Sequence, residues 1–321
     1  MSITRVNILK NATAMGKFCA GIKQLKNEFT GPTTTDLGID GPSRPVSTYD
    51  LFVVWHVNAM MTTTPVSGNP TGRNAAHRGP VFAAWHRFML RQLELNLQRV
   101  LGDTSFGLPY WDWAADGERT PQAQLRSKLW KSSGIGGTGT PIASGPFVFK
   151  PADNTSFRVR IDTDSNGNLQ QVNRGLNRSL AGSGVVDLPN KSDTAKALQL
   201  TPYDKAPWTV TSSGHRNYLE GWVGADGPGM HNRVHVWIGG DMSPASSPND
   251  PVFYLNHCNV DRIWEAWMQK NGRVYVPGAA APSSLKGHRI DDELASLVSP
   301  PIRPADVLNV TTQYVYDSLS V

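Results

Sequence analysis

The chain has 321 residues, of which 39% are hydrophobic and 18% are charged, so it can bury a sizeable core. Basic residues exceed acidic ones only by 31 to 26, without a long basic run or a pattern of basic and aromatic residues, which disfavours nucleic-acid binding. No stretch approaches the roughly 18 consecutive apolar residues of a membrane span, and the amino-terminal segment lacks the apolar core of a signal peptide. We therefore expect no membrane segment and a cytoplasmic protein as encoded, with export alongside a partner left open.

The first hundred residues predict three helices. An imperfect 3.6-residue apolar period over residues 2–29 indicates an amphipathic helix. Residues 48–62 are apolar almost all round, which is typical of a buried helix, and Ser47 or its successor can cap the start. The strongest helical pattern covers residues 82–102 and ends at Gly102, a residue type that commonly follows a helix C-terminus. This spacing favours a mainly helical fold.

The rest of the chain mixes long loops with two further helices. Over roughly residues 117–215 Gly, Ser, Pro and Asn are frequent, and the pieces FRVRID and DSNGNL predict a β-hairpin. Helical patterns return at residues 229–237 and 249–272, and residues 312–319 predict a closing strand. We therefore predict one mainly α domain over residues 1–321, with long loops and a few short β-strands.

Six of the eight histidines fall into two clusters, although a single histidine is more often structural or exposed than functional. In the first cluster two members lie inside the predicted helices 48–62 and 82–102, and the third lies on the loop between them. In the second cluster two members are four residues apart, so both project from one helix face, and the third lies inside the last helix. We expect the other two histidines, His215 and His288, to be structural or exposed. The first cluster is His56, His77 and His86, and the second is His231, His235 and His257.

Buried histidines in apolar helices call for a partner. An unsatisfied imidazole nitrogen costs about 1–3 kcal/mol, and a metal ion removes that cost by binding one nitrogen while the other donates to a nearby oxygen. Two sets of three histidines therefore indicate two metal ions. Ligands that are all imidazoles fit zinc or copper and disfavour magnesium, calcium and iron–sulfur centres. A three-histidine zinc hydrolase would explain one cluster and leave the other unexplained.

The motifs around both clusters resemble those of the type-3 copper proteins, and among them the tyrosinases and their bacterial relatives. The resemblance covers nearly the whole chain, including the segment LPYWDW and a Tyr-x-Tyr near the C-terminus. It implies a central four-helix bundle with two copper ions, each held by three histidines, that uses dioxygen to oxidise phenols. The matching motifs are FAAWHRFMLRQLE around His86, MHNRVHVWIGGDMS around His231 and His235, and SPNDPVFYLNHCNVDRIWEAW around His257.

The resemblance also implies roles for residues beside the ligands. Glu220, acting with Asn232, would hold a water that takes the proton of a phenol, whose pKa is near 10. The alternatives are a surface carboxylate and a helix-capping amide. A planar substrate ring would stack on a ligand such as His235. The loop over residues 221–230 is longer than we expect for the closest bacterial tyrosinases, which leaves the position of Glu220 open.

Four other positions depart from the family pattern or support it. Many tyrosinases have a histidine where Asn256 stands, next to the ligand His257, so Asn256 would retune substrate choice. Val236 and Ala245 fall where relatives carry residues that shape the entrance, and their small size favours bulky or substituted phenols. Asp261, one helical turn after His257, is placed to accept a hydrogen bond from a ligand imidazole; the alternative is a salt bridge with neighbours of Arg262.

We predict an oxidoreductase that hydroxylates monophenols and oxidises o-diphenols to o-quinones, with an o-aminophenol oxidase forming quinone imines as the alternative. A dioxygen carrier of the haemocyanin type would need a blocked substrate entrance, which the sequence does not show. The chain ends five residues after Tyr316, without room for the C-terminal domain that shields the site in many relatives. Copper loading would then depend on a separate small partner protein.

Overall fold

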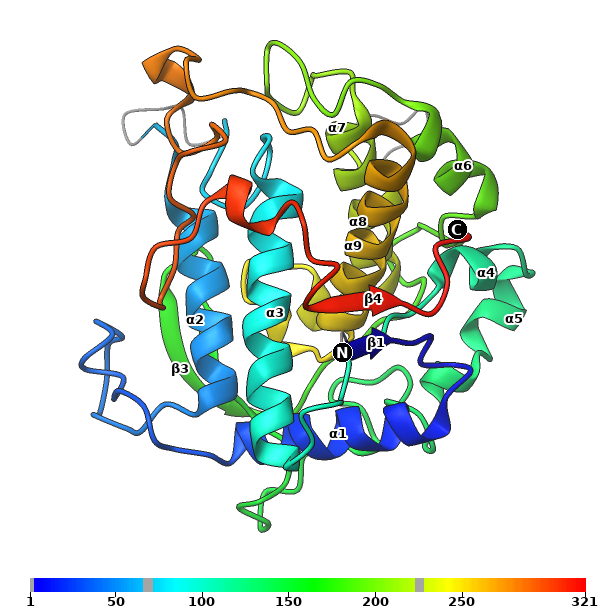
Figure 1. Cartoon of the computed structure of the whole chain (residues 1–321). Helices are drawn as coiled ribbons and strands as arrows, with labels where there is room; N and C mark the ends of the chain where they lie inside the picture. Colours follow the sequence, from blue (N-terminus) through cyan, green and yellow to red (C-terminus); the bar gives the residue numbers. More distant parts are fainter. Residues whose placement is uncertain (1–2, 66–71, 223–227) are drawn as a thin grey trace.

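The computed structural model describes residues 3–65, 72–222 and 228–321. A bundle of four helices forms the centre of the fold, and a further helix, α1 (Ala12–Lys26), lies across the ends of two of them (Figure 1). Within the bundle α3 packs against α9 and α9 packs against α8. The mainly helical fold with a central bundle is therefore confirmed. The bundle helices are α2 (Thr48–Met61), α3 (Phe82–Leu101), α8 (Met230–Ile238) and α9 (Val252–Asn271).

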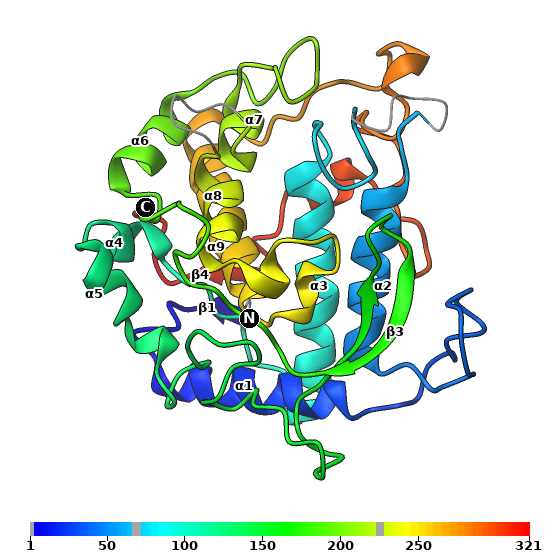
Figure 2. The ribbon, with the colours of Figure 1, turned by 180° about the vertical axis from the view of Figure 1, so that it is seen from behind.

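Shorter elements surround the bundle. β1 pairs in parallel with β4, and β2 pairs with β3 in the antiparallel hairpin that the sequence predicted. This hairpin packs against α2, as the view from behind shows (Figure 2). The strands are β1 (Ile3–Arg5), β2 (Val159–Thr163), β3 (Leu169–Arg174) and β4 (Tyr314–Tyr316). The short α-helices are α4 (Trp113–Gly117), α5 (Pro121–Leu125), α6 (Lys191–Gln199) and α7 (His215–Glu220). Single 3₁₀ turns are η1 (Lys128–Trp130), η2 (Gly240–Met242), η3 (Ser247–Asn249), η4 (Ser283–Leu285) and η5 (Pro304–Val307).

The ends of the bundle helices follow the predicted signals. The side chain of Ser47 caps α2 by accepting a hydrogen bond from the backbone N–H of Asp50. Gly102 ends α3 in the left-handed conformation, with φ of 62°, which glycine adopts without strain. At the start of α9 the carboxylate of Asp250 accepts a hydrogen bond from the backbone N–H of Val252 at 3.0 Å. These contacts fix the start of α2, the end of α3 and the start of α9, three of the four bundle helices.

The predicted helix over residues 2–29 is wrong at both of its ends. Its first residues form β1, and α1 begins only at Ala12, where the side chain of Asn11 caps it, and ends at Lys26. β1 pairs with β4, a strand from the opposite end of the chain. Local periodicity cannot reveal such a pairing, because it reports only on neighbours in the sequence.

Tryptophans dominate the interior around the bundle. Trp55 on α2 meets Trp85 on α3 edge to face, with ring centroids 5.5 Å apart, and both donate their indole N–H to the carbonyl oxygen of Ala295. Six tryptophans are fully buried: Trp85, Trp111, Trp113, Trp237, Trp264 and Trp267.

The two cysteines are also buried. Within the described ranges, no helix combines the length and the apolar character that crossing a bilayer requires.

Candidate metal centre

The first histidine cluster is assembled by α2, α3 and the segment before α3. His56 lies in α2 and His86 in α3, while His77 precedes α3. The ring centroids are 5.2 Å apart for His56 and His77, 4.7 Å for His77 and His86, and 5.8 Å for His56 and His86. All three are buried, and one nitrogen of each lies within 4.8 Å of the other two. The predicted convergence of these residues is confirmed.

The second cluster joins α8 to α9. His231 and His235 lie one turn apart on α8, with ring centroids 4.4 Å apart. His257 on α9 faces them, and its Nε2 lies 3.0 Å from the Nε2 of His231. The two clusters touch, because the ring of His86 stacks on that of His257 at 4.1 Å with an angle of 15° between planes. One interior site therefore contains both clusters.

Backbone carbonyl oxygens orient four of the six rings. A carbonyl oxygen only accepts hydrogen bonds, so the facing Nδ1 carries the hydrogen and the Nε2 keeps a lone pair. Those lone pairs are what a metal ion binds. The four Nδ1–H groups donate from His56 to Ala245 (2.6 Å), from His86 to Phe82 (2.7 Å), from His235 to Met242 (2.6 Å) and from His231 to Glu220 (3.2 Å).

The inward nitrogens fit a metal pair. The Nε2 atoms of His56, His86 and His235 are buried and have no hydrogen-bond partner among the described residues. Burial lowers the pKa of His56 to about 3 and that of His235 to about 4, and it holds the pKa of the other four ligands well below the usual value. Among the described residues no thiolate or carboxylate joins either set, and six neutral imidazoles suit copper or zinc.

A cavity of about 550 Å³ opens onto both clusters. His56 and His77 line it from the first cluster, and His231 and His235 line it from the second. This volume is within the usual range for small-molecule sites. Other lining residues are Met60, Arg78, Trp222, Asn232, Val236 and Pro244.

Glu220 and Asn232 both lie beside the ligand His231. The amide oxygen of Asn232 accepts a hydrogen bond from the Nδ1 of His231 at 3.0 Å, and Asn232 lines the cavity. The carboxylate of Glu220 is fully buried behind the wall, where it accepts hydrogen bonds from the backbone N–H of Arg78 at 2.7 Å and from the guanidinium of Arg216 at 3.0 Å. Burial raises the pKa of Glu220, while Arg216 opposes that shift. Part of the loop between Glu220 and His231, residues 223–227, lies outside the described residues.

Of the residues expected at the entrance, only Val236 lines the cavity. Asn256 is fully buried in α9, and neither atom of its amide has a hydrogen-bond partner within the described part of the chain. Ala245 contributes its carbonyl oxygen to orient His56. The expected entrance is corrected accordingly, because Asn256 is buried inside α9 and neither it nor Ala245 lines the cavity.

The expected hydrogen bond from a ligand imidazole to Asp261 is wrong. Its carboxylate accepts from Arg5 (3.1 Å), Arg87 (2.5 Å), Tyr314 (2.7 Å) and Tyr316 (2.5 Å). These donors come from both ends of the chain and from α3. They occupy both carboxylate oxygens, so Asp261 anchors α9 through salt bridges, as the alternative had it, but its partners are Arg5 and Arg87 and not the expected neighbours of Arg262.

His215 and His288 belong to neither cluster and are fully buried. The Nδ1 of His215 donates to the carbonyl oxygen of Ala197 at 2.9 Å, and its ring stacks on Trp267 at 4.8 Å. The Nε2 of His288 lies 2.6 Å from the hydroxyl of Thr64. Both therefore have the structural role that the sequence suggested.

Stability is expected to fall as the pH decreases from about 6.5 to about 4, in part because of these two histidines. Burial lowers the pKa of His215 to about 4 and that of His288 to about 3, from a usual value of 6.5. In this window the unfolded chain binds protons that the folded chain does not, so the free energy of unfolding decreases. Urea titrations should show that His288→Gln makes this slope shallower by about 1.4 kcal/mol per pH unit. Parallel slopes for variant and wild type would contradict the assignment.

Two residues that line the cavity, Arg78 and Trp222, were not predicted from the sequence. The guanidinium of Arg78 lies 5.5 Å from the ring centroid of Trp222, and both line the cavity. The position of Arg78 directly after the ligand His77 was the signal that could have found it. No such signal exists for Trp222, which follows α7 and reaches the site only through the fold.

Comparisons with known proteins agree with this geometry. A family model described as the common central domain of tyrosinase matches residues 46–270. The tyrosinase of Streptomyces glaucescens is 39% identical over 275 residues, which cover 84% of this chain and 89% of that protein. The grixazone synthase of Streptomyces griseus is 35% identical over 293 residues, covering 84% and 90%. A polyphenol oxidase structure from Thermothelomyces thermophila has a TM-score of 0.70 at 22% identity, covering 99% of this chain and 89% of that one.

The bundle and its two three-histidine sets define a dinuclear copper oxidoreductase that uses dioxygen. Within that class, the matched domain and the identity to bacterial relatives over most of the chain are decisive. The chain belongs to the tyrosinase family.

Proposed function

We propose that this protein is a phenol oxidase with both tyrosinase activities, the hydroxylation of monophenols and the oxidation of o-diphenols to o-quinones. The observation that carries the proposal is the 550 Å³ cavity that reaches both histidine clusters. It leaves room for a substrate ring beside the metal ligands, as turnover requires. A dioxygen carrier has no use for such a space. The 39% identity to a protein named tyrosinase supports the same activity.

The copper pair, when bound, supplies the oxidising chemistry with dioxygen, and the residues of the chain bind the ring and move its proton. Val236 and Pro244 offer an apolar wall, and the imidazole of His235 offers a stacking surface. We infer that Asn232 holds a water which accepts the phenol proton. Glu220 would assist Asn232 at this position. Its backbone carbonyl oxygen and the amide oxygen of Asn232 both accept from the Nδ1–H of His231, which places the two residues side by side.

An o-aminophenol oxidase is the second candidate. Val236 places an apolar side chain on the cavity wall, which gives no charge to attract the amino acid part of tyrosine. Asn256 stands where many tyrosinases have a histidine, and its amide, which has no hydrogen-bond partner among the described residues, lies next to the ligand His257. Copper delivery by a separate protein stays a prediction from the family resemblance.

Steady-state rates on tyrosine, catechol and o-aminophenol test the two candidates. We expect the copper-loaded protein to hydroxylate tyrosine and to oxidise catechol. Rapid oxidation of o-aminophenol with little hydroxylation of tyrosine would reject the first candidate in favour of the second.

The variant Asn232→Ala should separate the two activities further. Proton transfer by a positioned group contributes roughly 10²–10⁴-fold, so tyrosine hydroxylation should fall by about a hundredfold or more while catechol oxidation falls much less. Asn166→Ala, in the exposed turn of the hairpin, is the matched control. An equal loss of both activities would show that Asn232 serves only to orient His231.

A further inference from the structure

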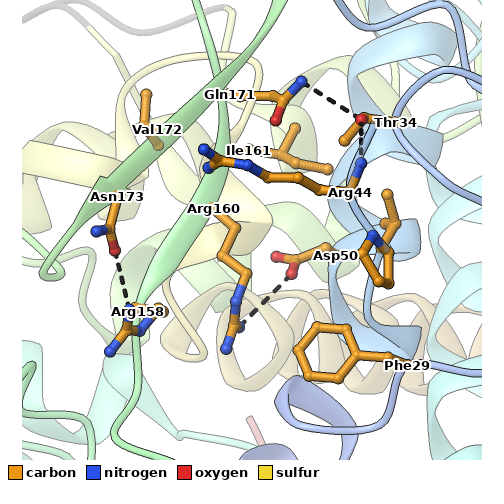
Figure 3. Close-up of a pocket in the computed structure, with 12 residues that line it drawn as sticks. Phe29, Thr34, Arg44, Asp50, Arg158, Arg160, Ile161, Gln171, Val172 and Asn173 are labelled. Carbon is orange, nitrogen blue, oxygen red and sulfur yellow. Dashed lines mark hydrogen bonds and ion pairs between the residues drawn. The ribbon is translucent and has the colours of Figure 1, made fainter. Parts of the chain in front are cut away.

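A second cavity has a volume of about 320 Å³, and Figure 3 shows the side chains that line it. It is formed by the hairpin of β2 and β3, the first turn of α2 and the loop over residues 34–46. None of the six metal ligands lines it. Its charged side chains are Arg44, Arg158, Arg160 and Asp50, so three guanidinium groups face one carboxylate.

The single carboxylate is already neutralised. Asp50 forms a buried ion pair with Lys26, and its other oxygen accepts a hydrogen bond from the hydroxyl of Ser47 at 2.6 Å. The guanidinium of Arg160 lies 3.8 Å from the same oxygen. Burial lowers the pKa of Arg160, and Arg158 lowers it further against the attraction of Asp50. The residues that line the cavity therefore leave an excess of positive charge.

Arg158 and Arg44 each have guanidinium N–H groups without an acceptor among the described residues. The Nε of Arg158 is buried and has no acceptor in the described ranges. The other two nitrogens donate to neutral oxygens, the amide oxygen of Asn173 at 3.1 Å and the backbone carbonyl oxygen of Asp153 at 3.0 Å. Arg44 is exposed, and its guanidinium forms no ion pair and no hydrogen bond with any described residue, so its donors are open to a ligand. The backbone of Arg44 is held by Thr34, whose hydroxyl accepts from the Arg44 N–H at 3.0 Å and whose N–H donates to the Arg44 carbonyl at 2.8 Å.

The rest of the wall combines apolar side chains with the polar residues Thr34, Gln171 and Asn173. The ring of Phe29, which is 43% exposed, lies 5.0 Å from the guanidinium carbon of Arg160. Val46, Ile161 and Val172 add aliphatic surface. A ligand in this cavity would thus meet both cationic groups and apolar surface.

We propose that this cavity binds a small molecule with an oxyanion, a carboxylate or a phosphate, attached to an apolar ring. Guanidinium groups bind both oxyanions through paired N–H donors. Such an anion would accept from the exposed guanidinium of Arg44, and its charge would offset the repulsion between Arg158 and Arg160. The ring would pack on Phe29 and the aliphatic residues. The site is separate from the copper centre and does not depend on the proposed oxidase activity.

Calorimetric titration of the copper-loaded protein with phenyl phosphate, and in parallel with phenylacetate, tests this proposal. We expect one molecule per chain, with affinity weakened at least about tenfold in Arg44→Gln, because a charge-assisted hydrogen bond is lost. Arg44→Lys should recover part of the affinity. Arg126→Gln, which removes an exposed arginine at the end of α5, is the control and should bind as the wild type does. The tighter of the two probes identifies the oxyanion.

Three outcomes would overturn the proposal. The first is equal affinity of wild type, Arg44→Gln and Arg158→Gln for both probes. The second is competition between the probe and catechol, which would place the anion at the copper centre. The third is equal affinity for inorganic phosphate and phenyl phosphate, which would remove the apolar part of the ligand from the assignment.

Discussion

Replacement of His86 by alanine is expected to lower the copper content from two ions per chain to one and to abolish most of the oxidase activity. His86 is a buried ligand whose Nδ1 is fixed by the carbonyl oxygen of Phe82 and whose ring stacks on His257. Loss of a residue that merely orients a ligand commonly costs about 10–100-fold, so loss of the ligand itself should cost more than about a hundredfold. Elemental analysis and the rate of catechol oxidation measure both effects.

His215→Gln is the matched control for this variant. His215 is as deeply buried as His86 and also donates through Nδ1 to a backbone carbonyl, but it belongs to neither cluster. It should keep two copper ions and, in the folded protein, full activity. If His86→Ala retained two copper ions and the wild-type rate, the first cluster would not be a metal site.

The ligands were accessible from the sequence because the helix repeat places residues four apart on one face. His231 and His235 follow this rule directly. His56 and His86 were identified by their unusual position in apolar helices. The sequence could not predict how the imidazole rings are oriented. The carbonyl oxygens that fix them, such as those of Ala245 for His56 and Met242 for His235, reach the rings only in the folded chain.

The errors share one physical origin, which is contact between distant parts of the chain. β1 was assigned to a helix because its partner β4 lies at the opposite end of the sequence. Asp261 was assigned to a ligand imidazole because Arg5 and Tyr316 are remote in the sequence, although they meet it in space. Local patterns predict elements well and predict their partners poorly.

The carboxylate of Asp261 is the centre of a buried charge network that links the two bundle helices beside the metal site. On α3, Arg87 directly follows the ligand His86 and pairs with Asp261. Arg5 pairs with Asp261 and with Glu94, and its guanidinium carbon lies 3.5 Å from the centroid of the Tyr314 ring. Two buried arginines thus depend on one carboxylate for part of their charge balance.

Asp261→Asn should therefore lower the free energy of unfolding by about 3–5 kcal/mol, the usual cost of removing one partner from a buried ion pair. The asparagine keeps the size of the side chain but leaves Arg5 and Arg87 without the charge that pairs them. Asp103→Asn, which breaks the surface pair with Lys17, should cost less than about 1 kcal/mol. Urea denaturation of the copper-loaded variants gives both values.

The pH dependence of this difference gives an independent check. Burial raises the pKa of Asp261, but Arg87 and Arg5 outweigh it and hold that pKa below the usual 3.8. The carboxylate therefore contributes its stability above about pH 4, and the contribution is lost as the pH falls further and the group takes up a proton. The gap between wild type and Asp261→Asn should narrow below pH 4. Arg87 also pairs with Glu265 at 2.9 Å. A gap that is smaller than 1 kcal/mol at pH 7, or one that does not change with pH, would mean that Glu94 and Glu265 alone balance Arg5 and Arg87.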